Sequence, residues 1–263
     1  MSASIKLGIV GGAGWLGGAI ASAAIEAGVV RAQDLALSYR SAKPDRFPGA
    51  FWTGDNQALA DRCDIIMLSV RPQDWPSLGL DAKGKLVISV MAGIRLAEIG
   101  DKHRTGRVVR SLPNAAAEVA KSYTPWIASD GATDADRIAT RAIFAACGVQ
   151  DEVASERDID YLTGLTGSGP AFPALLAEAM MRDAVRFGLA PDVARRAVNT
   201  VLAGAGRLIE RDDSSPADLV EAFLGYRGTT AAAIETMRAE GFDKAVAKGL
   251  AAAFEKSIAM GKA

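Results

Sequence analysis

The chain has 263 residues, with 30 Lys and Arg against 31 Asp and Glu, and a formal net charge of −1 at pH 7. With 49% hydrophobic and 23% charged residues it has enough apolar side chains for a sizeable core, which argues against global disorder. The near-neutral charge argues against a nucleic-acid partner, because such proteins need a basic face.

Membrane, secreted and metal-binding classes are also disfavoured. No apolar run approaches the roughly 18 residues that span a bilayer, and residues 1–4 lack the features of a signal peptide. Two cysteines, Cys63 and Cys147, are too few for a disulfide framework, and with the single His103 they are too few for a zinc site. We therefore expect a cytoplasmic protein that has no membrane partner and no metal.

The first half alternates short apolar runs with helical stretches. The predicted strands cover 6–10, 34–39, 50–53, 65–70, 86–91, 107–111, 123–128 and 149–153, and a helix over 15–27 ends at Gly28. The continuous apolar runs at 65–70 and 86–91 are typical of strands buried on both faces of a parallel sheet. Strands separated by helices indicate βαβ units and the α/β class.

From about residue 158 the strand signals stop and alanine-rich helical segments follow. One helix is predicted from Pro170 to Gly188 and a second from Pro191 to about residue 210, while Ser215 is the predicted N-cap of a third. Two more are predicted from about residue 229 and over 243–260. The sequence therefore predicts two domains, a doubly wound sheet over 1–157 and an all-α domain over 158–263.

A glycine-rich pattern, G-x-G-x-x-G, lies directly after the first predicted strand and opens a helix. It consists of Gly12, Ala13, Gly14, Trp15, Leu16 and Gly17. Such glycines permit a tight turn and close approach of a pyrophosphate, and the helix N-terminus offers free N–H donors. In this strand–turn–helix context the pattern predicts a dinucleotide site. Gly11 precedes the motif, and its effect on the loop is left open.

The end of the second predicted strand bears on the choice of cofactor. A site for NADH usually has Asp or Glu there, whereas this chain has Ser38 followed closely by Arg40. A guanidinium is a bidentate donor that suits a 2′-phosphate. The sequence therefore predicts a preference for NADPH, with NADH as the alternative, unless Arg40 is a solvated loop residue.

Other dehydrogenase patterns are weaker. Tyr39 and Lys43 fit the Y-x-x-x-K of short-chain dehydrogenases, but they lie beside the adenosine end of the cofactor, so chance is the better explanation. The absence of lysine between Lys121 and Lys244 argues against the β-hydroxyacid dehydrogenases. His103 is expected in a solvated turn rather than as a catalytic base.

Two hydroxyl-bearing helix starts are predicted in the second half, at 166–170 and 228–230. Each alone is most simply a helix cap, but together, in a chain with a dinucleotide fold, they indicate a pocket for a small carboxylate. The predicted substrate-binding residues there are Ser168, Gly169, Thr229 and Thr230. Glu178 is the only ionisable residue over 169–181, so we expect it to be buried and paired or to have a raised pKa, with a role in proton supply as the sharper hypothesis.

Several spaced motifs resemble those of the pyrroline-5-carboxylate reductase family over nearly the whole chain. They are the glycine loop, T-G-D-N at 53–56, V-R-P-Q at 70–73, R-S-L-P-N at 110–114, D-Y-L-T-G-L-T-G-S-G-P-A-F at 160–172, and G-T-T at 228–230 followed by G-F at 241–242. The chain is thus similar to a divergent member of that family.

The resemblance implies an N-terminal Rossmann domain and a C-terminal helical domain that intertwines with a second subunit in a homodimer or larger assembly. It implies an oxidoreductase acting on CH–NH bonds with NAD(P)H, which reduces a cyclic imine carboxylate, most directly 1-pyrroline-5-carboxylate to proline. The further cofactor residues that it implies are Asn56, Ser69, Val70, Arg71, Pro72 and Asn114. The proton would come from Thr230 or water, with Glu178 as a less direct contributor.

The chain departs from the family pattern beside this expected pocket. Tyr226 and Arg227 stand where the family reads Pro-Gly, and Ala115 and Ala116 stand where it reads Thr-Pro. Arg227 is expected either at the mouth of the substrate pocket or turned to solvent. Two alternatives stay open, a reductase of a different imine or imino acid on the same fold and a non-catalytic NADPH-binding sensor dimer.

Overall fold

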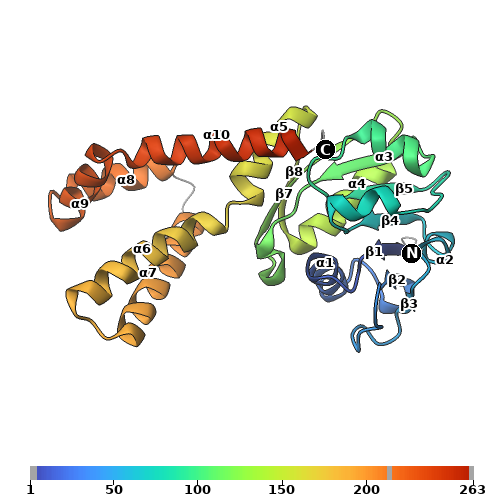
Figure 1. The fold of residues 1–263 in the computed structure, drawn as a ribbon, viewed down its shortest axis with the longest axis horizontal. Coiled ribbons are helices and arrows are strands. Elements are labelled where there is room, and N and C mark those ends of the chain that lie inside the picture. Colours follow the sequence, from blue (N-terminus) through green and yellow to red (C-terminus); the bar gives the residue numbers. More distant parts are fainter. Residues whose placement is uncertain (1–4, 212–214, 261–263) are drawn as a thin grey trace. The chain divides into compact units, whose positions relative to one another are not determined.

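The structure is a computed structural model that describes residues 5–211 and 215–260, so the prediction on residues 1–4 lies outside the described residues. The chain divides into two compact units (Figure 1). The first consists of the described residues up to Ser168 together with those from Ala252 on, and the second consists of Gly169–Ala251. The first unit extends beyond residue 157 because α5 (Glu156–Leu162) packs against the sheet and η4 (Thr163–Gly167) follows it directly.

The first unit is built on an eight-stranded sheet with the order β3-β2-β1-β4-β5-β6-β7-β8. The strands are β1 (Leu7–Val10), β2 (Leu35–Ser38), β3 (Phe51–Thr53), β4 (Ile65–Leu68), β5 (Leu86–Ser89), β6 (Val108–Ser111), β7 (Ser122–Ala128) and β8 (Gly148–Glu152). The first six are parallel, β7 is antiparallel to β6, and β8 is parallel to β7. The predicted strands are confirmed, with ends shifted by one or two residues.

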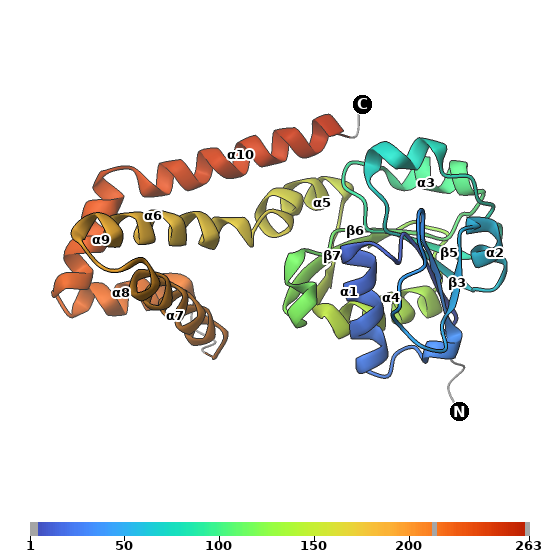
Figure 2. The ribbon, with the colours of Figure 1, turned by 60° about the horizontal axis from the view of Figure 1, so that its bottom comes forward.

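Alternate residues of the central strands pack into separate cores on the two faces of the sheet. Ile65 and Met67 of β4 join one core, whereas Ile66 and Leu68 join the other. The first core is covered by α1 (Trp15–Glu26) and α4 (Asp134–Cys147), and the second by α2 (Asn56–Asp61) and α3 (Leu96–His103), as Figure 2 allows the reader to follow. Helices on both faces explain why these strands are apolar throughout.

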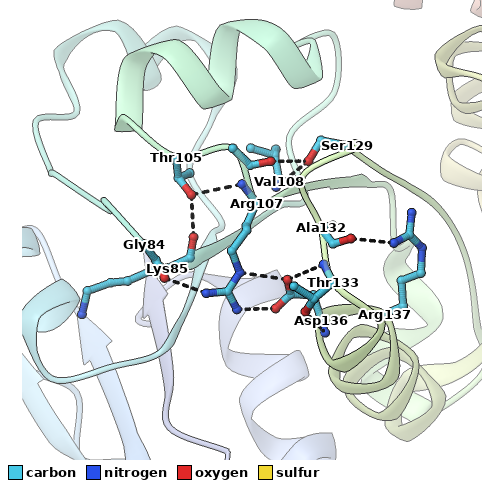
Figure 3. Close-up of polar contacts among 11 residues, drawn as sticks. Gly84, Lys85, Thr105, Arg107, Val108, Ser129, Ala132, Thr133, Asp136 and Arg137 are labelled. Carbon is cyan, nitrogen blue, oxygen red and sulfur yellow. Dashed lines mark hydrogen bonds and ion pairs between the residues drawn. The ribbon is translucent and has the colours of Figure 1, made fainter.

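A polar clamp ties the amino end of β6 to the start of α4 (Figure 3). Arg107 donates from Nε to Asp136 Oδ2 at 2.9 Å and from Nη2 to Asp136 Oδ1 at 2.5 Å, and its Nη1 donates to Gly84 O at 2.6 Å. Burial alone raises the pKa of Asp136, but the hydrogen bonds from Arg107 and Thr133 outweigh it and lower the pKa. The clamp lies at the amino ends of the central strands, away from their carboxyl ends, and its role is structural.

The second unit is helical. It contains α6 (Ala171–Phe187), α7 (Pro191–Arg211), α8 (Pro216–Gly225), α9 (Thr229–Ala239) and the first part of α10 (Phe242–Met260). The predicted caps are present, since Gly188 ends α6 with φ 111° and Ser215 forms a capping box with Asp218 at the start of α8. No helix among the described residues is long and apolar enough to cross a membrane.

The apolar side chains of α6 lack cover in the single chain. Within the described residues no residue of α6 is buried, and Leu175 and Phe187 are largely exposed. The expected burial of Glu178 is wrong for the single chain, because its side chain is 63% exposed and pairs with Arg182 at 2.6 Å on the next turn. Uncovered apolar helix faces of this kind are typical of protein–protein contact surfaces.

Candidate active site

The turn between β1 and α1 is made by Gly11, the glycine that precedes the motif. Gly11 has φ +81°, and a Cβ there would lie 2.3 Å from Ser69 O, so no other residue fits. Gly12 has a different task, because a Cβ on it would lie 2.5 Å from Leu37 Cδ2. The turn therefore depends on Gly11 as well as on the first glycine of the motif, because Gly14 N donates to Gly11 O at 2.8 Å across Gly12. This answers the open question about Gly11.

The N–H groups of this loop are largely bound within the protein. Gly11 N donates to Ser38 Oγ at 3.0 Å, Ala13 N donates to Ser38 O at 3.1 Å, and Gly14 N donates to Gly11 O at 2.8 Å. Ser38 thus holds the loop with both its hydroxyl and its carbonyl group. The first turn of α1, which starts at Trp15, lacks intrahelical acceptors for its N–H groups. These are the donors that remain for a phosphate group.

A cleft of about 730 Å³ lies at the carboxyl ends of β1, β2 and β4. This is where the strand order reverses, which is the usual ligand position in doubly wound sheets. The predicted cofactor residues that line it are Ala13, Gly14, Ser38, Arg40, Asn56, Ser69, Val70 and Arg71. Among the described residues, those predicted for the cofactor that do not line this cleft are Gly12, Trp15, Leu16, Gly17, Pro72 and Asn114.

Two of these residues outside the cleft have other partners. The indole Nε1 of Trp15 donates to Glu118 Oε1 on η3 (Ala115–Val119). Asn114 is buried, its Nδ2 donates to Thr166 O at 3.0 Å and its Oδ1 accepts from Ala116 N at 2.9 Å. The Asn114 amide therefore connects the loop after β6 to η4.

The charged part of the cleft consists of two arginines and one aspartate. Arg71 donates from Nε to Asp74 Oδ2 at 2.8 Å and from Nη2 to Oδ1 at 3.2 Å, and Arg40 Nη1 lies 3.7 Å from Asp74 Oδ2. The side chains of Arg40 and Arg71 are 79% and 60% exposed. Two exposed guanidiniums beside a glycine loop suit the phosphate groups of NADPH.

Asp74 was missed in the sequence. It lies in the 3₁₀ helix η2 (Pro72–Ser77), and the hydrogen bond from Arg71 holds the pKa of Asp74 below its usual value. The available signal was its position three residues after Arg71, since one helical turn brings such a pair together. The second partner, Arg40, follows β2, whereas Asp74 lies beyond the end of β4. Both strands flank β1 in the sheet, so their carboxyl ends lie at the same edge and the two side chains come within reach of each other.

The predicted serine of the substrate pocket follows a π-helical turn, η4, in the first unit. Ser168 donates from N to Thr163 O at 3.0 Å, and its exposed hydroxyl lies 3.4 Å from the same oxygen. Gly167 packs so closely that a Cβ would lie 2.7 Å from Leu112 Cδ2. Single π-helical turns are frequent at functional sites.

The predicted threonines lie in the second unit, at the start of α9. Thr229 and Thr230 are exposed and are the first two residues of the helix, after the extended N-cap residue Gly228. Arg227 has φ +51°, a left-handed conformation that favours glycine. An arginine is therefore held in a strained backbone geometry two residues before Thr229. Gly169 begins the second unit, whereas Ser168 belongs to the first unit.

His103 and the two cysteines are not candidates for the chemistry. The prediction of a solvated turn for His103 is wrong, because the side chain is fully buried; its Nε2 accepts from Trp75 Nε1 at 3.2 Å and its Nδ1 lies 3.2 Å from Leu80 O. Burial lowers the pKa of His103 and raises the pKa of both Cys63 and Cys147 to about 11. Among the described residues, no three His, Cys, Asp or Glu side chains are grouped in a way that could hold a metal ion.

Two family models match the chain. Residues 156–260 match the model for pyrroline-5-carboxylate reductase dimerisation, which includes the uncovered helix α6. Residues 6–93 match the model for NADP oxidoreductase, coenzyme F420-dependent, which includes the glycine loop and the cleft arginines. The first match shows that the chain carries the dimerisation region of that family.

Relatives of known name match over nearly the full length. The chain is 32% identical to pyrroline-5-carboxylate reductases from Synechocystis sp. (98% of this chain, 99% of the relative) and Methanosarcina acetivorans (98% of each). Among solved structures, the Coxiella burnetii reductase has a TM-score of 0.88 at 26% identity, covering 99% and 100% of the two chains. The Plasmodium falciparum reductase, solved with NADP bound, has a TM-score of 0.83 at 25% identity, covering 98% of each. The chain therefore belongs to the pyrroline-5-carboxylate reductase family.

Proposed function

We propose that this protein is an oxidoreductase acting on CH–NH bonds, which reduces 1-pyrroline-5-carboxylate to proline with NADPH, and more weakly with NADH. The observation that carries the proposal is a cleft with two exposed guanidiniums at the switch point of the sheet, in a chain whose likeness to named reductases extends through both units. A protein that only senses NADPH would not need the hydroxyl-bearing helix starts at 166–170 and 228–230.

Bound NADPH would supply a hydride to the carbon of the C=N bond. The free N–H groups at the start of α1 would hold the pyrophosphate, and Gly14 would let it approach the backbone. Arg40 and Arg71 would hold the 2′-phosphate, while Asn56 and Val70 line the rest of the cleft. Asn114 acts indirectly, because it fixes η4 through the carbonyl group of Thr166.

Two groups of residues, each taken by itself, are the proposed donors to the substrate carboxylate: Ser168 with Gly169, and Thr229 with Thr230. These residues offer hydroxyl and backbone donors without a dedicated cation. A protonated cyclic imine is already a strong electrophile, so the protein contributes mainly orientation. Proton delivery is assigned to Thr230 or water. The further contribution predicted for Glu178 is not required by this scheme.

The assembly that we propose is a homodimer or a larger homo-oligomer built from the second unit. The support for it is the dimerisation match together with the uncovered apolar side chains of α6. A cytoplasmic location is also part of the proposal, because both cysteines, Cys63 and Cys147, are free thiols.

A more acidic cyclic imine is the second candidate substrate. It is favoured by Arg227, because a non-glycine residue has φ +51° two residues before Thr229. A guanidinium at this position would pair with a second carboxylate on the substrate.

The test is turnover of 1-pyrroline-5-carboxylate, followed as loss of NADPH absorbance, by the wild type and by Arg227→Gly. Efficient turnover that is unchanged in Arg227→Gly supports the first candidate. Weak turnover that improves in Arg227→Gly, together with better use of a dicarboxylic cyclic imine by the wild type, supports the second. Cofactor binding without turnover of either compound contradicts both candidate substrates and supports the alternative of a non-catalytic NADPH-binding sensor.

A further inference from the structure

We propose that Asp74 sets the cofactor preference of the cleft, because its carboxylate competes with the 2′-phosphate of NADPH for Arg40 and Arg71 and accepts a hydrogen bond from the 2′-hydroxyl of NADH. The inference rests on the proposed role of the cleft as the cofactor site. It gives a role to an acidic side chain that the proposed mechanism does not use.

The carboxylate of Asp74 is an anion of the protein itself that lies where the two arginines would bind an anionic group of the cofactor. Both carboxylate oxygens face the guanidinium of Arg71, at 2.8 and 3.2 Å, which is the bidentate arrangement by which arginine also binds phosphate. Arg40 approaches the same Oδ2 from β2, at 3.7 Å. Asp74 therefore occupies the donors that a 2′-phosphate needs.

The charges make the two roles of Asp74 opposite for the two cofactors. The cluster of Arg40, Arg71 and Asp74 has a net charge of +1, from two cations and one anion. A monoester phosphate carries about −1.5 to −2 at pH 7, so it gains the arginines but meets a carboxylate of like charge. An unphosphorylated ribose offers a hydroxyl donor, and a carboxylate is the usual acceptor for it in NADH sites.

Asp74 is also accessible to a ligand. Its side chain is 34% exposed and lines the cleft together with Ser41 and Ser77. The two arginines are mostly exposed, so they are free to turn from Asp74 to a bound phosphate without unfolding any element. The same residue is thus able to contact either form of the ribose.

The experiment compares binding of 2′,5′-ADP and 5′-AMP by titration calorimetry at low salt, with the wild type and Asp74→Asn. These fragments carry the adenosine end with and without the 2′-phosphate. We expect the ratio of the two dissociation constants to shift by about tenfold toward 2′,5′-ADP in Asp74→Asn, which corresponds to about 1.4 kcal/mol. The same shift is expected between NADP⁺ and NAD⁺.

The matched control is Asp101→Asn, which removes an exposed acid on α3 that does not line the cleft, within the described residues. It should leave the ratio unchanged, so that the net charge of the protein is ruled out as the cause. A ratio that stays at the wild-type value in Asp74→Asn overturns the proposal.

Two further outcomes also overturn it. If 2′,5′-ADP binds more weakly to both Asp74→Asn and Asp74→Ala, the carboxylate only holds Arg71 in place. If the wild type binds neither fragment, the cleft is not the cofactor site. None of these measurements depends on imine turnover, so a failure of the proposed reaction would be seen separately.

Discussion

Arg110 on β6 and Asp160 on α5 form an ion pair that is buried on both sides, with 2.6 Å between Nη2 and Oδ1 and exposed fractions of 0% and 3%. The same guanidinium lies 3.0 Å from Glu156 Oε1, and the other oxygen of Asp160 lies 2.9 Å from Arg95 Nη2. Because α5 leads directly through η4 to Ser168, this network fixes the chain that carries the predicted substrate serine.

Asp160→Asn should lower the free energy of unfolding by about 3 kcal/mol, the low end for a broken buried pair, because Arg110 loses one buried counter-charge and keeps Glu156. The measurement is urea unfolding followed by circular dichroism. Asp192→Asn is the control, since its pair with Arg196 is on the surface of α7 and should contribute less than about 1 kcal/mol. Equal losses in the two variants would contradict the importance of burial.

Arg40→Ala should raise the KM for NADPH by about 10–100-fold while changing that for NADH little. The reason is that a hydrogen bond to a charged group contributes roughly 1.5–3 kcal/mol, and only NADPH has the 2′-phosphate. Arg71→Ala should behave in the same way. Lys83→Ala, which removes an exposed cation outside the cleft, is the control within the described residues. Parallel effects on both cofactors would reject the assignment of Arg40.

Thr230→Ala and Ser168→Ala should each reduce kcat/KM for the imine by about 10–100-fold, for the loss of one hydrogen bond to a carboxylate. NADPH binding, measured by fluorescence titration, should stay near the wild-type value. Thr236→Ala on the same helix is the control, because its hydroxyl is bound to Ala232 O at 2.8 Å. Wild-type activity in both site variants would place the substrate elsewhere.

The stability of the protein should fall as the pH drops below about 6.5, the ordinary pKa of histidine. Burial lowers the pKa of His103 in the folded state, so below pH 6.5 the unfolded chain takes up a proton that the folded chain excludes, until the folded-state pKa is reached. His103 is the single histidine, so no other imidazole contributes to this effect. His103→Gln should show a smaller loss of urea midpoint between pH 7.5 and 5.5; an identical loss would refute this account.

Local signals were sufficient for much of the fold. The apolar runs at 65–70 and 86–91 predicted buried strands because a parallel strand covered on both faces has no polar side. Pro191 and Ser215 marked helix starts because a missing N–H group and a capping hydroxyl act within one turn of the chain. The glycine loop was found for the same reason, although the positive φ in its turn belongs to Gly11, the residue before the motif.

The sequence by itself determined the sheet-forming part, the helical part, the glycine loop and the arginine that follows the second strand. Each of these features is specified by residues only a few positions apart in the chain. Only the tertiary structure decided how polar groups are paired over longer separations. It buried His103 against Trp75, 28 residues earlier, although the flanking residues of the histidine are charged. It also brought Arg40 to Asp74, which follow β2 and β4 on either side of β1. The pairing of two charges depends on their distance in the folded structure, which the spacing along the chain does not reveal.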